Sequence, residues 1–81
     1  MERVAGHRDK EGYLVKLGSA IRDQRKELGL SQEALADAAG IDRAHMGKIE
    51  RGERNVTLLN VIRVAVALGI PASVLLDRAG L

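Results

Sequence analysis

Residues 28–52, LGLSQEALADAAGIDRAHMGKIERG, predict two short helices joined by a tight turn. Ser31 is a good N-cap for the first helix, because a hydroxyl accepts a hydrogen bond from a free amide of the first turn. Gly40 is the expected end of that helix, since glycine readily takes the left-handed conformation found at helix C-termini. Asp42 is the N-cap of the second helix, which we expect over residues 43–51.

The second of these helices has two different faces. Met46 and Ile49 point to one side, where they can enter a core. The other side carries three cations and two very small residues at positions i, i+1, i+4, i+5 and i+8, namely Arg43, Ala44, Gly47, Lys48 and Arg51. A helix with a packed inner side and a basic, sterically open outer side is suited to the major groove of DNA.

Helical patterns also occur on both sides of this pair. A run of apolar residues at helical spacing predicts a first helix over residues 13–28, with Leu14, Leu17, Ile21 and Leu28 on its inner face. A fourth helix is expected over residues 58–68 and a fifth over residues 72–78, where the single proline of the chain precedes the first turn. We therefore predict an all-α fold of five helices in one domain, residues 12–81.

The composition of the 81 residues limits the possible classes of protein. The chain has no cysteine, so disulfides and thiolate metal sites are excluded, and it has no Phe or Trp, so its core must be aliphatic. No apolar run approaches the roughly 20 residues of a membrane span. We therefore expect a cytoplasmic protein that has no membrane partner.

The first eleven residues, MERVAGHRDKE, mix charge with glycine and show no period. We interpret residues 1–11 as a flexible arm. Arg3, Arg8 and Lys10 could follow a phosphate backbone or enter a minor groove, as the arms of some DNA-binding proteins do. The alternative is a solvated tail with no contact to DNA.

The segments LGLSQEALA (28–36), AAGI (38–41) and KIERG (48–52) resemble the helix-turn-helix of the phage repressor Cro/C1, or XRE, family. The resemblance continues through ALGI (67–70) to LL (75–76) and so covers most of the chain. It implies a lambda-repressor-like fold and a transcriptional regulator that binds a specific double-stranded DNA sequence. Controller proteins of restriction–modification systems, small phage repressors and some antitoxins share this length and layout.

If the chain binds DNA as this resemblance implies, the outer face of the second helix of the pair is expected to contact bases. The fork of Arg43 suits O6 and N7 of guanine, and Ala44 could touch a thymine methyl group. Lys48 would contact a neighbouring guanine or a phosphate. Gly47 permits close approach of the backbone to the groove, or is simply a tolerated small residue.

Phosphate contacts are expected at two places that flank this face. Ser31 and Gln32 begin the first helix of the pair, where free amides and the helix dipole favour an anion. Arg51, Arg54 and Asn55 belong to the end of the second helix and the loop after it. Such contacts would supply affinity and register, whereas the bases would supply specificity.

Arg25 lies among the core-side positions of the first helix, which is unusual for a charged residue. The family resemblance implies that it pairs with Glu50 and ties the first helix to the third. The alternative is that both side chains are separately solvated.

The fourth and fifth helices carry more aliphatic residues than a helix packed on one side needs. A homodimer interface would use this surplus, and we expect it to include Leu59, Ile62, Val66, Val74, Leu75 and Leu76. The alternative is that these residues complete a core that lacks aromatic side chains.

Catalysis has little support in the sequence. His7 lies in the expected arm, and His45 lacks a Cys or carboxylate partner at the spacing of a metal site or a catalytic triad. No phosphate-binding loop follows a strand. We expect no enzyme activity, cofactor, metal or small-molecule ligand. The competing hypothesis is a protein–protein interaction module that uses the same fold to bind a protein partner.

Overall fold

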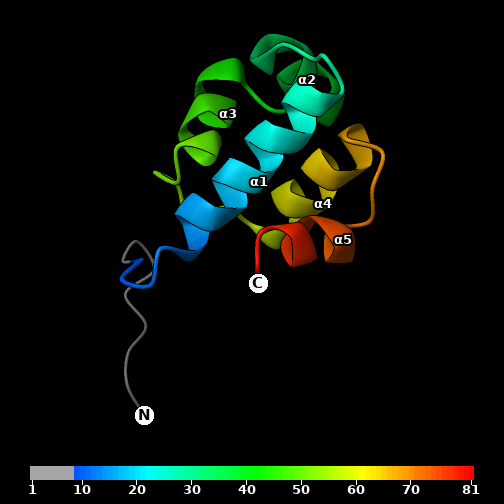
Figure 1. Ribbon diagram of the computed structural model, residues 1–81. Helices are drawn as coiled ribbons and strands as arrows, with labels where there is room; N and C mark the ends of the chain where they lie inside the picture. The colour runs from blue at the N-terminus through cyan, green and yellow to red at the C-terminus, as the bar shows by residue number, and fades with distance from the viewer. Residues whose placement is uncertain (1–8) are drawn as a thin grey trace.

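The computed structural model describes residues 9–81, which form five α-helices and contain no strand (Figure 1). The all-α prediction is confirmed for this part of the chain. Arg3 and Arg8 of the expected arm lie outside the described residues. The helices are α1 (Tyr13–Glu27), α2 (Gln32–Ala39), α3 (Arg43–Glu50), α4 (Leu58–Ala67) and α5 (Ala72–Arg78).

A capping turn precedes α1. The carboxylate of Asp9 accepts hydrogen bonds from the backbone amides of Tyr13, at 2.7 Å, and Leu14, at 2.9 Å. Gly12 adopts the left-handed conformation this turn requires, with φ of 72°. Residues 9–11, which the sequence analysis assigned to the arm, therefore belong to the turn that starts the first helix.

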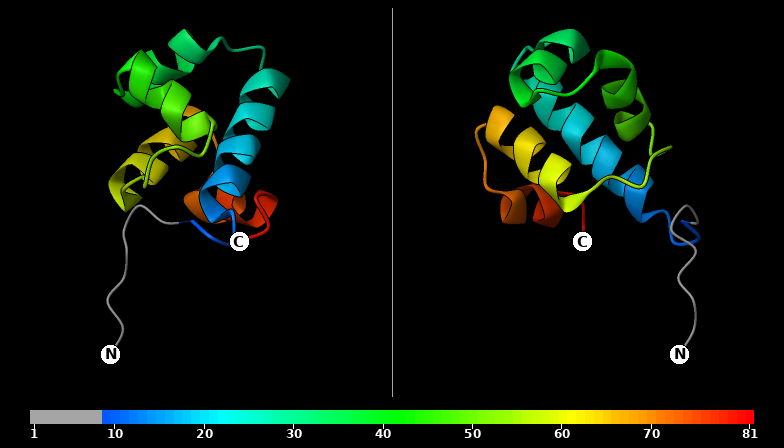
Figure 2. Two further views of the ribbon diagram at one scale, coloured as in Figure 1. Left: turned by 90° about the vertical axis from the view of Figure 1, so that its left-hand side faces the viewer. Right: turned by 180° about the vertical axis from the view of Figure 1, so that it is seen from behind.

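Helix α1 runs along one face of the molecule, which is the front in Figure 1, and the other four helices lie beside or behind it (Figures 1 and 2). It packs against α3 and α5, while α2 packs against α3 and α4, and α4 packs against α5. Within residues 9–81 no single helix is long and apolar enough to cross a membrane. Only α4 and α5 together, bent by 93° at their junction, have that length and composition.

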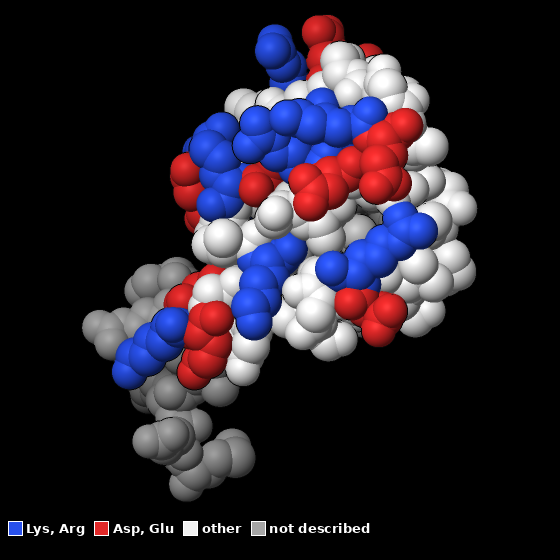
Figure 3. All heavy atoms as spheres, viewed as in Figure 1, with Lys and Arg blue, Asp and Glu red and all other residues white. Residues whose placement is uncertain are grey.

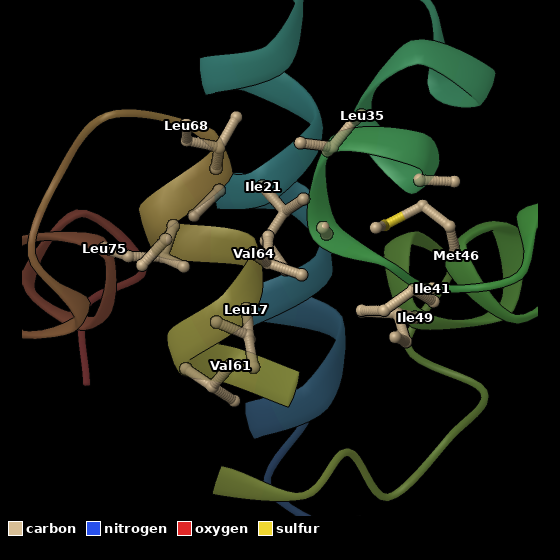
Figure 4. Packing of buried hydrophobic residues seen from close by; sticks show 14 of the residues in the cluster. Leu17, Ile21, Leu35, Ile41, Met46, Ile49, Val61, Val64, Leu68 and Leu75 are labelled. Carbon is tan, nitrogen blue, oxygen red and sulfur yellow. The ribbon is translucent and has the colours of Figure 1, made fainter. Parts of the chain in front are cut away.

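The core is aliphatic, as the composition predicts, and every helix contributes to it (Figure 4). The prediction that Leu28 lies on the inner face of the first helix is wrong, because this residue is 49% exposed. Helix α1 ends one residue earlier, and Leu28 occupies the C-cap position. The largest side chains that are fully buried are Ile21, Leu35, Met46, Val64 and Leu75.

Helices α1 and α3 approach closely at Gly18. A Cβ atom on Gly18 would lie 2.4 Å from the backbone oxygen of Glu50 and 2.5 Å from that of Ile49. Glycine inside a helix is otherwise less favourable than alanine. In the fold it allows the end of α3 to lie directly against α1, and this contact fixes the position of α3 relative to the core.

The predicted dimer interface is wrong at Leu75, which lies on helix α5. Leu75 has no exposed surface and points into the protein's own core beside α4, so it cannot lie at a contact between two copies (Figure 4). Val74 is half-buried, and Leu76 packs against the same core. This arrangement follows from the contacts of α5 with both α1 and α4, which turn its apolar side inward.

Candidate nucleic-acid interface

The turn between α2 and α3 is built as the sequence predicts. The Ser31 hydroxyl accepts a hydrogen bond from the Ala34 amide at 3.0 Å, and the Asp42 carboxylate accepts one from the His45 amide at 3.3 Å. Gly40 ends α2 with φ of 67°. These local interactions set the angle at which α3 leaves the turn.

Helix α3 is buried on one side and open on the other. Met46 and Ile49 are buried in the core, whereas Arg43 and Ala44 are exposed. The open side forms a shallow hollow of about 400 Å³ between α2 and α3, lined by Gln32, Arg43, Ala44, Gly47, Lys48 and Arg51. The structure therefore brings together all four residues expected to contact bases and two of those expected to contact phosphate.

A second hollow, of about 250 Å³, shares Gln32 and Arg51 with the first and extends it toward α1. Its remaining lining residues are Arg22, Arg25 and Glu50. Figure 3 shows Lys and Arg side chains forming a broad band on this part of the surface. Sequence reasoning missed Arg22, although its spacing of three residues from Arg25 places the two on one side of α1.

The expected pair of Arg25 and Glu50 is present. The Arg25 Nε donates to Glu50 Oε2 at 2.8 Å and Nη2 donates to Oε1 at 3.0 Å, with side-chain exposures of only 11% and 3%. Arg25 Nη1 also donates to the backbone oxygen of Leu30 at 2.9 Å. Gln32 Nε2 donates to Glu50 Oε1 at 3.1 Å, so the pair also fixes one side chain of the hollow.

Arg51 has a carboxylate partner that sequence reasoning did not consider. Its Nε donates to Glu53 Oε2 at 2.7 Å, and its Nη2 donates to Oε1 at 3.4 Å. The hydrogen bond from Arg51 is the main cause of a lowered pKa of Glu53; desolvation opposes this effect, and the charges of Arg51 and Lys48 add to it. Glu53 is therefore ionised at neutral pH. The separation of only two residues between Arg51 and Glu53 was the feature of the sequence that could have indicated this pair.

The other expected phosphate contacts lie around the hollow. Ser31 is exposed at the N-terminus of α2, while Arg54 and Asn55 are exposed in the loop between α3 and α4. Arg54 and Asn55 do not line either hollow. Their role in binding phosphate stays a prediction.

This fold and this basic, open helix define a helix-turn-helix protein of the DNA-binding class. A family model described as helix-turn-helix (HTH_3) matches residues 21–75, and the chain belongs to this XRE-type family. The family consists of transcriptional regulators and is not a family of enzymes. Among residues 9–81 no three His, Asp or Glu side chains are grouped so that they could hold a metal ion.

Several relatives are controller proteins. The chain is 45% identical over 65 residues to the control protein C.SmaI of Serratia marcescens, and the matched segment covers 80% of this chain and 77% of that protein. It is 39% identical over 60 residues to C.MunI of a Mycoplasma species, covering 73% and 81% of the two chains. The crystal structure of the restriction-modification controller protein C.AhdI from Aeromonas hydrophila shares 48% identity, with a TM-score of 0.75, covering 76% of this chain and 94% of that one.

Proposed function

We propose that this protein regulates transcription by binding a two-fold symmetric DNA operator as a homodimer, in the role of a restriction–modification controller. The observation that carries the proposal is the open basic hollow along α3, whose walls combine long cations with very small residues. Similarity to C.SmaI and C.AhdI supports the controller role. Because such a regulator acts on the genome, we place it in the cytoplasm.

The residues of the hollow would have separate tasks on DNA. Arg43, the exposed first residue of α3, would bind O6 and N7 of a guanine. Ala44 beside it leaves room for a thymine methyl group. Lys48, one turn later, would bind a neighbouring guanine or a phosphate. Gly47 is itself buried, and because it has no side chain the ends of the Gln32 and Arg51 side chains can lie close to it.

The phosphate contacts frame this reading face. The free amides at Ser31 and Gln32 belong to the N-terminus of α2, where the helix dipole favours an anion. Arg54 and Asn55 would bind the backbone on the opposite side of the groove. These contacts fix the register of the protein on the duplex and do not depend on base sequence.

The dimer is proposed from an apolar stripe on α4. Within residues 9–81, Leu59 is 56% exposed, Ile62 43% and Val66 73%, and Leu58 at the start of the helix is 69% exposed. Aliphatic residues at helical spacing that the chain does not bury itself are typical of an interface between copies. A symmetric dimer would place two α3 helices on half-sites about one helical turn apart.

The same stripe supports a second candidate function, in which α4 binds a protein partner of a different kind. The two functions make different demands on α3. An interaction module would not need an open basic helix, whereas a DNA-binding dimer needs both surfaces. The α3 hollow therefore favours DNA binding.

The test is selection of random duplexes by the purified protein, followed by sequencing of the bound pool. We expect an enriched palindrome that contains guanine in each half-site, and loss of that guanine preference in Arg43→Ala. Specific binding should also weaken steeply as salt rises, because phosphate neutralisation releases counterions. Enrichment of no sequence at moderate salt would contradict the proposal and favour the interaction module.

A further inference from the structure

The Arg51 side chain lies on the face of α3 that is proposed to contact bases, which is not the position expected for a contact to the DNA backbone alone. Sequence reasoning assigned it to the phosphate contacts because it is at the end of α3. The structure places its side chain in the wall of the hollow that also contains Arg43 and Lys48. A Cβ atom on Gly47 would lie only 3.1 Å from Arg51 Nη1, so the guanidinium lies across the reading face of the helix.

Glu53 determines which edge of this guanidinium is available. The carboxylate accepts from Nε and Nη2, which form the side edge of the fork. Glu53 uses neither hydrogen of Nη1 and only one hydrogen of Nη2, so the end edge, formed by one hydrogen from each of these nitrogens, is not used by Glu53. An end edge of this kind matches the two acceptors, O6 and N7, that guanine presents in the major groove.

The position of Glu53 is difficult to explain by stability or by affinity. Both partners are more than half exposed, with 56% and 53% of their side chains accessible, and exposed ion pairs contribute little to folding. A carboxylate at the edge of a DNA-binding face also repels phosphates and so weakens binding to all sequences. Groups that reduce general affinity while fixing one contact increase specificity.

We propose that Arg51 reads a guanine in the operator and that Glu53 is the positioning residue that orients it. This inference rests on the proposed DNA-binding function and adds a second base-reading arginine to Arg43. The depressed pKa of Glu53 is consistent with it, because the carboxylate stays charged and keeps its two hydrogen bonds at neutral pH.

The central variant is Arg51→Lys, which keeps the positive charge but loses the planar fork. Wild type and variant are compared by random-duplex selection and by titration of the selected duplex against single-base changes. We expect the variant to retain its affinity for unrelated DNA and its salt dependence. One guanine preference per half-site should fall by about 5- to 150-fold, the range for a bidentate base contact.

Glu53→Gln tests the positioning role. It should lower the same guanine preference while raising affinity for unrelated DNA, because a negative charge leaves the face. In the Arg51→Lys background it should change no base preference further. The matched control is Glu27→Gln, which removes the same charge from a separate cleft between α1 and α5 and should change no preference.

The outcomes separate this inference from the proposed function. If wild type enriches no sequence, the proposed function fails and this inference fails with it. If wild type enriches a palindrome but Arg51→Lys keeps every base preference, Arg51 is a phosphate contact and only this inference is overturned. If Glu53→Gln leaves the guanine preference intact, the positioning role of Glu53 is overturned.

Discussion

Arg25 and Glu50 are joined by two hydrogen bonds, 2.8 Å and 3.0 Å long, between the last turn of α1 and the last residue of α3. Planar guanidinium and carboxylate groups meet edge to edge, which is the strongest geometry for such a pair. Because Glu50 also accepts from Gln32, the pair links α1, α2 and α3 at one point. The orientation of α3 therefore depends on two residues outside the proposed DNA-reading face.

Arg25→Ala should destabilise the protein by about 3–5 kcal/mol, because the Glu50 carboxylate would be left buried with Gln32 as its remaining partner. Urea unfolding followed by circular dichroism measures this change. The double variant Arg25→Met with Glu50→Leu, which removes both charges, should recover most of the loss. A single variant within about 1 kcal/mol of wild type would show that the carboxylate is adequately solvated.

Gly18→Ala should destabilise the protein by about 1–3 kcal/mol, even though alanine is the better helix former. The added Cβ would meet the backbone oxygens of Ile49 and Glu50, and backbone atoms cannot move aside as the end of a side chain can. Thermal unfolding measures the effect. Ser19→Ala, at the exposed neighbouring position of α1, is the control and should leave stability unchanged or slightly raised.

The helix boundaries could be predicted because their signals are local. Ser31 and Asp42 accept the predicted capping hydrogen bonds, and the Thr57 hydroxyl accepts the corresponding bond from the Asn60 amide at the start of α4. Glycine and the apolar periodicity indicated the helix ends within one or two residues. The face of α3 followed from the same periodicity, since neighbours on a helix surface are fixed by spacing alone.

What could not be predicted depends on contacts between distant parts of the chain. The need for glycine at Gly18 arises from the approach of α3, which no local pattern encodes. Leu75 appeared to be surplus until the position of α5 showed that the core needs it. The orientation of Arg51 depends on the conformation of the loop that carries Glu53.

Ile62→Glu combined with Val66→Glu should convert the proposed dimer into a folded monomer. Both side chains are exposed in the protomer, so the charges do not enter its core, but a symmetric contact through α4 would bring four carboxylates together. Sedimentation measures the mass, and circular dichroism checks the fold. Leu28→Glu, at another exposed leucine, is the control and should stay dimeric.

A dimer that survives the double substitution would place the interface elsewhere. Leu75 is unsuitable for the same test, because a charge at a fully buried position would unfold the protein whether or not copies associate. The exposed residues of α4 therefore allow association to be tested separately from folding.

Gly47→Ala should raise stability by up to about 1 kcal/mol, because alanine favours the middle of a helix over glycine. The added Cβ would lie 3.1 Å from Arg51 Nη1 and 3.3 Å from Gln32 Oε1, and both contacts are with the ends of flexible side chains. These ends can shift with little effect on the core, but the shift moves Arg51 across the reading face. We therefore expect the guanine preference of Arg51 to weaken while that of Arg43 persists, as measured by titration with single-base variants of the selected duplex. A loss of stability instead would show that the Gln32 and Arg51 side chains are held too firmly to move.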